Sequence, residues 1–392
     1  MVVSSYVRYE PGYGRYPITV LEYKQMAGRA GRPRYDPVGE ALLVAKRSDE
    51  LEFLLESYVL AAPERIWSKL GAENVLRSHV LATIASGYAD SLKGVLEFFG
   101  KTLYAMQYSA EGMRRAIQQV VEFLAREDLV QPDVDKLYPT PFGKRVSELY
   151  IDPISAVVIR DALERGAKLV TEVSFLHLIC HTPDLSPPLY PRRKELKNLV
   201  PFLEDHRYEL FFEVPEEWED PVSYERFLAE IKGAMVLESW INEVSEDALI
   251  ERFGIEPGDL FRLVETADWL LSAVYELAKL FKKHQYLPKV LELRDRVRSG
   301  IKPELLPLVR IEGVGRVRAR SLYNAGYKTI EDLRKASVDE LTKVSFIGPT
   351  LAKRLKEAVE KGLEAPRAVF SHLAEEELPQ EEGVQAKLTE FS

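Results

Sequence analysis

Apolar residues recur at three- and four-residue intervals over most of the chain from about residue 63 onward. Two stretches show the pattern clearly, ERIWSKLGAENVLRSHVLATIASG and EGMRRAIQQVVEFLAREDLV, and both predict amphipathic helices. Further helical patterns fill residues 152–297, where HTPDLSPPLYPRR and VPEEWEDP interrupt them. The chain is therefore predicted to be mainly α.

The beginning of the chain has a different pattern. Two β-like runs, at 2–7 and 39–46, flank the helical stretch LEYKQMAGRA, and RYEPGYGRYP (8–17) is predicted to be a loop. This order is typical of an α/β domain, whose parallel strands are normally covered on both faces. About 50 residues cannot complete such a sheet, so this segment is predicted to be only marginally stable by itself.

Between LAREDLV and LYPTPFGKRVSEL, a short turn and β-prone residues precede another helix, and this arrangement predicts a winged helix. We accordingly divide the sequence into five parts: the end of an α/β domain (1–55), a winged helix (56–151), a helical domain (152–297), a compact basic unit (298–366) and an acidic tail that is predicted to be disordered (367–392).

An internal repeat with an offset of 33 residues lies in the basic unit, where IEGVGRVRARSL (311–322) aligns with VSFIGPTLAKRL (344–355). Two copies of a hairpin followed by a basic helix predict a small DNA-binding module. Four pairs of residues match between the copies: Gly315 with Gly348, Ala319 with Ala352, Arg320 with Lys353, and Leu322 with Leu355.

The distribution of charge also indicates that the basic unit (298–366) binds DNA. The formal charge of −9 gives no overall nucleic-acid signal, but residues 298–361 hold 14 Lys and Arg against eight Asp and Glu, a net of +6. Backbone N–H groups at a glycine hairpin and at the following helix N-terminus favour phosphate, although a solvated charged helix is the alternative. The predicted DNA-binding residues of this unit are Gly313, Gly315, Arg316, Arg318, Arg320, Gly348 and Lys353.

The helix predicted for residues 256–281 carries two residues that suit single-stranded DNA. Arg262 and Trp269 are seven residues apart, so they lie two turns along one polar face. A base can stack on an exposed indole, and a guanidinium can hold the neighbouring phosphate. The alternative is that Trp269 packs at the edge of the apolar stripe against another helix.

The motif QMAGRAGRP places arginines where they could meet a nucleotide. Arginine stabilises charge on a transferring phosphoryl group because its planar fork binds oxygens bidentately. The candidate catalytic residues are Gln25, Arg29 and Arg32, with Gly28 and Gly31 in the nucleotide-contacting loop; the alternative is a basic helix end capped by glycine. The chain contains no G-x-x-x-x-G-K-[ST] phosphate loop, and GVLEFFGKT (94–102) is predicted to be a turn between helices.

Neither the HLICH motif nor the single cysteine is predicted to have a catalytic or metal-binding role. His177, Cys180 and His181 of HLICH could share a helical face, but no fourth ligand follows, so core packing and no metal site are predicted. Cys180 is the only cysteine, which excludes a disulfide framework, and no signal peptide or apolar run of about 18 residues is present. A cytoplasmic protein without a membrane partner is predicted.

Taken in order, these segments resemble the archaeal Hjm-type DNA helicases of superfamily two, which are related to the helicase part of eukaryotic polymerase theta. The resemblance rests on VLEYKQMAGRAGRP, which is similar to the last helicase motif, and on GDLFRLVETADWL and GVGRVRARSLYNAG. It implies the end of a second RecA-like motor domain, a winged helix, a helical ratchet domain and a helix-hairpin-helix domain.

The resemblance also implies an ATP- and Mg²⁺-dependent enzyme that unwinds DNA from 3′ to 5′ at stalled, branched replication forks. In it, Arg29 and Arg32 would be nucleotide-sensing fingers, Arg262 and Trp269 would belong to the ratchet helix, and Arg318 and Arg320 to the DNA-gripping motif. The family begins with a complete first motor domain, so this chain is expected to be a C-terminal part that works, as a monomer, with an N-terminal motor portion. The alternatives are a stand-alone DNA-binding fragment without ATPase activity and a relative of the RNA helicases.

The acidic tail ends in QAKLTEFS, where Gln385, Leu388 and Phe391 follow one another at intervals of three. One helical turn would bring the two apolar side chains together, as in short motifs that dock in grooves. The spacing resembles the peptide by which replication proteins bind the sliding clamp, but Ser392 replaces its second aromatic residue. An ordinary tail end is the alternative.

We predict that the 392-residue chain alone does not hydrolyse ATP, because it contains neither a phosphate loop nor an Asp-Glu-x-His or Asp-Glu-x-Asp string to hold magnesium. An ATPase assay with and without single-stranded DNA measures this, and clear turnover by the purified chain would contradict the prediction.

Overall fold

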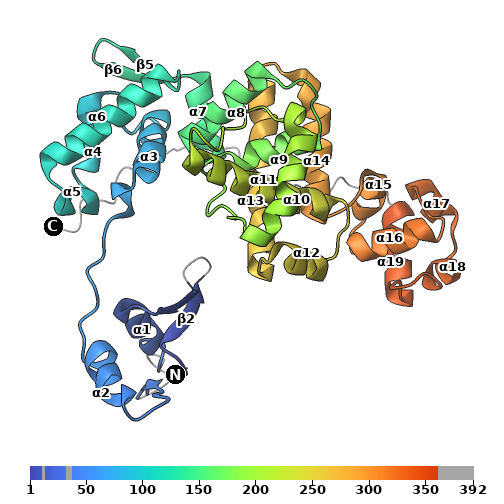
Figure 1. Ribbon diagram of the computed structural model, residues 1–392, viewed down its shortest axis with the longest axis horizontal. Coiled ribbons are helices and arrows are strands. Elements are labelled where there is room, and N and C mark those ends of the chain that lie inside the picture. Colours follow the sequence, from blue (N-terminus) through green and yellow to red (C-terminus); the bar gives the residue numbers. More distant parts are fainter. Residues whose placement is uncertain (11–13, 32–37, 361–392) are drawn as a thin grey trace, which may run out of the picture. The chain divides into compact units, whose positions relative to one another are not determined.

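The computed structural model describes residues 1–10, 14–31 and 38–360, and most of these residues are helical, which confirms the mainly α prediction (Figure 1). The chain forms two compact units, one of residues 1–72 with 97–114, and one of residues 73–96 with those from 115 onward. None of the described helices is long and apolar enough to cross a bilayer.

The first unit contains the predicted strand–helix–strand order in a reduced form. Strands β1 (Val2–Val3) and β4 (Leu42–Leu43) pair in parallel, and α1 (Val20–Ala27) lies between them in the sequence. Thr19 and Glu22 form a capping box that fixes the start of α1. The small core of this unit consists of Val3, Ile18, Tyr23, Leu54 and Tyr58, the last two from α2 (Glu50–Leu54) and a π-helical turn (Leu55–Val59).

The prediction of a loop at residues 8–17 is wrong. Strands β2 (Val7–Glu10) and β3 (Gly14–Pro17) form an antiparallel hairpin, with Arg8 opposite Tyr16. The tyrosine-rich segments favour strands, and this preference outweighs the glycine and the proline that lie within β3. The segment 94–102 comprises the end of α4 (Leu92–Phe99) and a turn before α5 (Leu103–Gln107), as predicted.

The elements expected of a winged helix lie mostly in the second unit, with the first residues of α6 in the first unit. These are α3 (Glu73–Ala85), α6 (Ala110–Arg126), an antiparallel hairpin of β5 (Val130–Asp133) and β6 (Lys136–Pro139), and α7 (Pro141–Leu149). The Thr140 hydroxyl accepts a hydrogen bond from the Gly143 N–H at 3.0 Å and so caps α7. A Cβ at Gly143 would lie 1.8 Å from the Leu129 carbonyl oxygen, so only glycine permits this close approach of helix and strand.

The long helix α13 (Pro257–Leu280) is the core element of the helical domain. Its buried stripe includes Leu263, Ala267, Leu271 and Val274, as the periodicity predicted, and it packs against α14, α8 and α9 (Figure 1). The other helices of the domain are α8 (Pro153–Arg165), α9 (Glu172–Cys180), α10 (Leu196–His206), α11 (Pro221–Ile241), α12 (Glu246–Phe253) and α14 (Leu287–Ser299).

The internal repeat is present in the backbone as well as in the sequence. Gly313 has φ +85° and Phe346, its counterpart 33 residues later, has φ +65°. The Ala319 N–H donates to the Gly315 carbonyl at 2.9 Å, and Ala352 donates to Gly348 at the same distance. The helices are α15 (Leu306–Val309), α16 (Arg316–Asn324), α17 (Ile330–Lys335), α18 (Val338–Thr342) and α19 (Pro349–Glu360).

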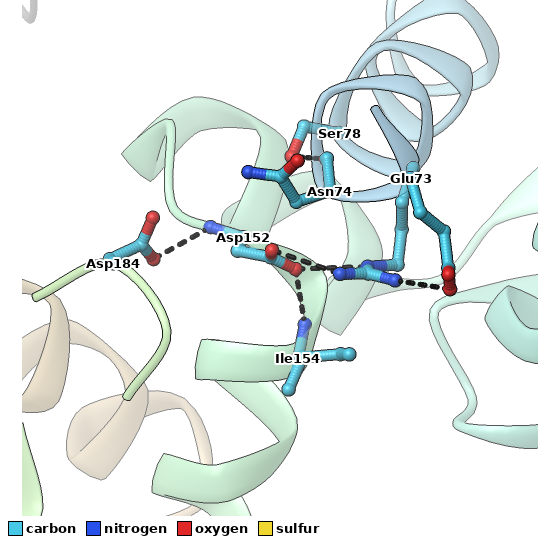
Figure 2. Close-up of polar contacts among 7 residues, drawn as sticks. Glu73, Asn74, Ser78, Asp152, Ile154 and Asp184 are labelled. Atoms are coloured by element: carbon cyan, nitrogen blue, oxygen red, sulfur yellow. Dashed lines mark hydrogen bonds and ion pairs between the residues drawn. The ribbon is translucent and has the colours of Figure 1, made fainter. Parts of the chain in front are cut away.

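A buried ion pair joins α3 to the start of α8 (Figure 2). The Arg77 guanidinium donates two hydrogen bonds to the Asp152 carboxylate, both 3.0 Å long, and both side chains are only 6% exposed. Asp152 also accepts from the Ile154 N–H, and its own N–H donates to Asp184. One carboxylate therefore caps α8 and holds α3 against the start of α8.

We expect Arg77→Ala to lower the free energy of unfolding of the second unit by about 3–5 kcal/mol, because Asp152 would keep a buried charge without its partner. Urea denaturation measures the change. The control is Arg165→Ala, which removes an exposed arginine at the end of α8 and should change stability by less than about 0.5 kcal/mol. Equal, small losses in both variants would contradict the expectation.

Candidate nucleic-acid interface

Trp269 lies on α13 at the boundary between the core and the surface. Its side chain is half-buried, and the indole N–H donates to the Leu149 carbonyl at 3.1 Å, which fixes the ring against the end of α7. The indole therefore packs at the edge of the apolar stripe and also lines a groove.

That groove, which we call the α13 groove, has a volume of about 670 Å³. Its walls are largely apolar and aromatic, and the Phe261 side chain in it is 65% exposed. Flat rings that face solvent are the surfaces on which unpaired bases stack. The lining residues used below are Trp240, Glu246, Phe261, Asp268, Trp269 and Arg298.

A second groove, the hairpin groove, has a volume of about 520 Å³. It lies at the joint between the helices of residues 152–297 and the repeat unit, by which we mean the described residues 298–360 with both hairpins. It shares Trp240 and Glu246 with the α13 groove, so the two grooves adjoin. Its other lining residues come largely from the two hairpins: Ser299, Gly315, Arg316, Val317, Arg318 and Phe346.

The arginines of the first hairpin helix differ in what they contact. Arg316 is half-buried, donates to the Val244 carbonyl at 2.6 Å and lies over the Trp240 ring at 4.7 Å. Arg320 donates to Glu243 at 2.8 and 2.6 Å and to Glu304 at 2.7 Å. Both side chains therefore help to join the repeat unit to the helical domain.

These contacts shift the pKa values of the charged groups at the joint. The hydrogen bonds to Glu243 raise the pKa of Arg320 above its usual value, and burial lowers the pKa of Arg316. Burial acts to raise the pKa of Glu243, but hydrogen bonds from Arg320 hold it below the usual value. These charges compensate one another, so they give the joint little net field.

Arg318 has the most exposed position of the three arginines. Among the described residues, its guanidinium donates to the Gly313 carbonyl alone, at 2.8 Å, within the hairpin itself. Gly313 and Gly315 are exposed beside it, and Gly348 and Lys353 have the equivalent exposed positions in the second copy. The structure brings Gly315, Arg316 and Arg318 together with Phe346 in one groove.

Arg262 and Trp269 have different surroundings in the described part of the chain. Arg262 is absent from the residues that line the α13 groove, and its guanidinium donates to the Ser186 and Pro187 carbonyls at 3.0 and 3.2 Å. Within the α13 groove, Asp268 receives hydrogen bonds from Arg298 and from Arg294. Two cations of α14 thus compensate the charge of the carboxylate next to Trp269.

The candidate catalytic residues lie in the first unit. Gln25 and Arg29 are exposed and line a pocket of about 540 Å³ together with Arg8 and Glu22, so the structure brings these two predicted residues together. Gly28 has ordinary helical backbone at the end of α1, whereas Gly31 has φ +77° and lies against Gly39. Arg32 lies outside the described residues.

Two other predictions concern sites elsewhere in the chain. His177 is fully buried and Cys180 is 4% exposed, in agreement with core packing, whereas His181 is half-buried. The predicted clamp-binding residues Gln385, Leu388 and Phe391 lie outside the described residues, as does the whole tail.

Sequence reasoning missed three aromatic residues of the grooves: Trp240, Phe261 and Phe346. Phe346 occupies the repeat position of Gly313, so the alignment contained a signal, namely a bulky ring where the first copy has glycine. Trp240 gave no local signal because its role depends on contacts with residues of the distant repeat unit.

Three family models match separate parts of the chain. The family model described as "Archaeal helicase, domain 4" matches residues 173–300, and a SAM-like helix-hairpin-helix tandem matches residues 305–361. A helix-turn-helix domain model matches residues 39–131. The two grooves therefore lie on the domain 4 and helix-hairpin-helix matches.

Similar proteins are called ATP-dependent DNA helicase Hel308. The one from Methanocella arvoryzae is 41% identical over 90% of this chain, the one from Pyrococcus abyssi is 40% identical over 87%, and the one from Aeropyrum pernix is 36% identical over 98%. The alignments cover 47%, 47% and 52% of those proteins, so the chain spans about half their length. The predicted resemblance to archaeal DNA helicases is confirmed.

We expect Trp269→Ala to weaken binding of single-stranded DNA by about 1–3 kcal/mol, because one base–aromatic stack is lost. Fluorescence anisotropy with a labelled oligonucleotide measures the affinity, and circular dichroism confirms the fold. Trp269→Phe keeps a ring and should retain most of the affinity. Trp218→Ala, which removes a 78% exposed indole outside both grooves, is the control, and a loss equal to that of Trp269→Ala would contradict the prediction.

Proposed function

We propose that this chain, of which residues 173–300 match a model of an archaeal helicase domain, is the C-terminal portion of an ATP-dependent DNA helicase. It would hold the translocating single strand in the α13 groove and the hairpin groove, while a complete motor supplies the energy. By this proposal, ATP and Mg²⁺ bind the whole enzyme, and branched or stalled replication forks are its substrates.

The observation that carries the proposal is the continuity of the two grooves through Trp240 and Glu246. One side offers rings on α13 for bases, and the other offers the exposed residues Gly313, Gly315 and Arg318 of the first hairpin for phosphates. Stacking tolerates every base, and phosphate contacts carry no sequence information. The arrangement therefore suits a protein that must move along DNA of any sequence.

Arg29 would act at the nucleotide rather than at the DNA. It is exposed in the same pocket as Gln25, where a guanidinium could meet a phosphate bound by another part of the motor. Arg32, in the same motif, would be the second finger.

The alternative classes differ in measurable ways. A stand-alone DNA-binding fragment would bind DNA without any response to ATP when the N-terminal motor portion is added in trans. An RNA helicase relative would prefer RNA in competition with a DNA strand of matched sequence. We favour DNA because the comparisons find a helix-hairpin-helix tandem and DNA helicases.

The test is a competition experiment on the purified chain. Labelled single-stranded DNA is displaced by matched RNA, by duplex DNA and by a forked substrate, at several salt concentrations. We expect DNA to be preferred over RNA and affinity to fall with salt. A preference for RNA, or no DNA binding even at low salt, would overturn the proposal.

We predict that substitution of Arg318 affects DNA binding, whereas substitution of Arg320 affects stability. Arg318→Ala should reduce DNA affinity uniformly across sequences and lower the salt slope by about one, since its exposed guanidinium would contact one phosphate. Lys353→Ala, at the exposed position of the second copy that matches Arg320, should behave alike. Lys194→Ala removes an exposed lysine outside both grooves and is the control.

Arg320→Ala should mainly lower the melting temperature, because Glu243 and Glu304 would lose their shared partner. Binding titrations as a function of salt and thermal melts on the same samples separate the two effects. An unchanged salt slope in Arg318→Ala, with a reduced slope in Arg320→Ala, would reverse the assignment.

A further inference from the structure

Two histidines and one glutamate meet inside the helical domain. His177 and His181 lie one turn apart on α9, and Glu230 approaches them from α11. One ligand atom from each residue lies within 4.8 Å of the other two. The Glu230 Oε2 is 3.7 Å from the His177 Nε2 and 2.6 Å from the His181 Nδ1.

His177 is the anomaly in this cluster. Its side chain is 0% exposed, and neither ring nitrogen has a hydrogen-bond partner among the described residues. The 3.7 Å separation from Glu230 is too long for a hydrogen bond. A buried polar group that is left unpaired costs about 1–3 kcal/mol, so its presence needs a physical reason such as a bound ion.

We propose that His177, His181 and Glu230 bind a first-row divalent metal ion, with Zn²⁺ as the best match, and that the ion joins α9 to α11. Two imidazoles and one carboxylate on three corners of a tetrahedron are a ligand set that Zn²⁺ accepts, with water at the fourth position. Imidazole favours zinc over magnesium or calcium, which prefer oxygen ligands alone.

The distances from the Glu230 oxygen to the two histidines are compatible with such a site. Metal–ligand bonds of about 2.0–2.1 Å at tetrahedral angles place neighbouring ligand atoms about 3.3 Å apart. The His177–Glu230 separation of 3.7 Å is already close to this value. The His181–Glu230 pair, at 2.6 Å, would open by about 0.7 Å, and the half-buried His181 ring has solvent on one side to allow this.

The surroundings hold the three ligands in place. The Arg226 Nε lies 3.4 Å from the other oxygen of Glu230, which leaves Oε2 to face the histidines. Phe212 stacks on His181 with ring centres 3.9 Å apart, and Phe227 lies 4.7 Å from His177. Orienting partners and an apolar shell are the usual surroundings of a metal site.

The experiment uses the untagged chain after dialysis against a chelator. Isothermal titration with ZnCl₂ gives stoichiometry and affinity, and CoCl₂ gives the visible d–d absorption bands of a four-coordinate ion. The ligand variants are His181→Gln and Glu230→Gln. The control is His206→Gln, which removes a histidine that also lies beside a carboxylate, 3.0 Å from Glu209, in the same domain.

We expect one equivalent of Zn²⁺ to bind the original chain and His206→Gln alike, and to raise the melting temperature of both. Affinity should fall by at least about 100-fold in the two ligand variants, because metal affinity depends on every ligand. Absence of saturable one-to-one binding, or undiminished binding in His181→Gln, would overturn the proposal. If Glu230→Gln fails to fold, the half-exposed His181→Gln still decides.

Discussion

The burial of one face of α13 is the constraint on which the candidate DNA-binding surface depends. Leu263, Ala267 and Leu271 must face the helices packed around α13, and the helical period then fixes where every other side chain points. Trp269 falls at the edge of that stripe, where one side of the indole can pack and the other can face a groove. Phe261 falls on the exposed face of the same helix.

Much of the charge in the second unit is used to join elements rather than to attract a ligand. The Arg77–Asp152 pair joins α3 to α8, and Arg320 joins the repeat unit to Glu243. Buried pairs of this kind add little net stability, since desolvation offsets their attraction, but breaking them is costly. They favour one arrangement of the helices, and exposed cations such as Arg318 are left for other contacts.

Local features could be predicted from the sequence because they depend on nearby residues. The apolar period predicted α13, and the glycines and the offset of 33 predicted the two hairpins, whose backbones match. The hairpin β2–β3 was missed because its glycine and proline signals dominated the strand signals around them. Contacts between distant segments could not be predicted in this way, because no local sequence pattern indicates them.

The residues of the candidate DNA-binding site also have partners that could not be predicted from the sequence. Arg320 was predicted to bind DNA from its place in a basic helix, and only the fold reveals that Glu243 and Glu304 surround it. The third residue of the histidine cluster, Glu230, lies on α11, and no spacing rule connects it to the HLICH motif. Long-range partners are set by packing, which a local pattern does not encode.

The position of Trp240 gives the molecule a built-in optical reporter. Its indole donates to the Val297 carbonyl at 2.7 Å, lies beneath Arg316, and borders both grooves. With Trp269 it makes up two of the four tryptophans of the chain. Indole emission responds to polarity and to nearby quenchers, so occupation of either groove, or a shift of the joint between the two domains, would change the intrinsic fluorescence without any attached dye.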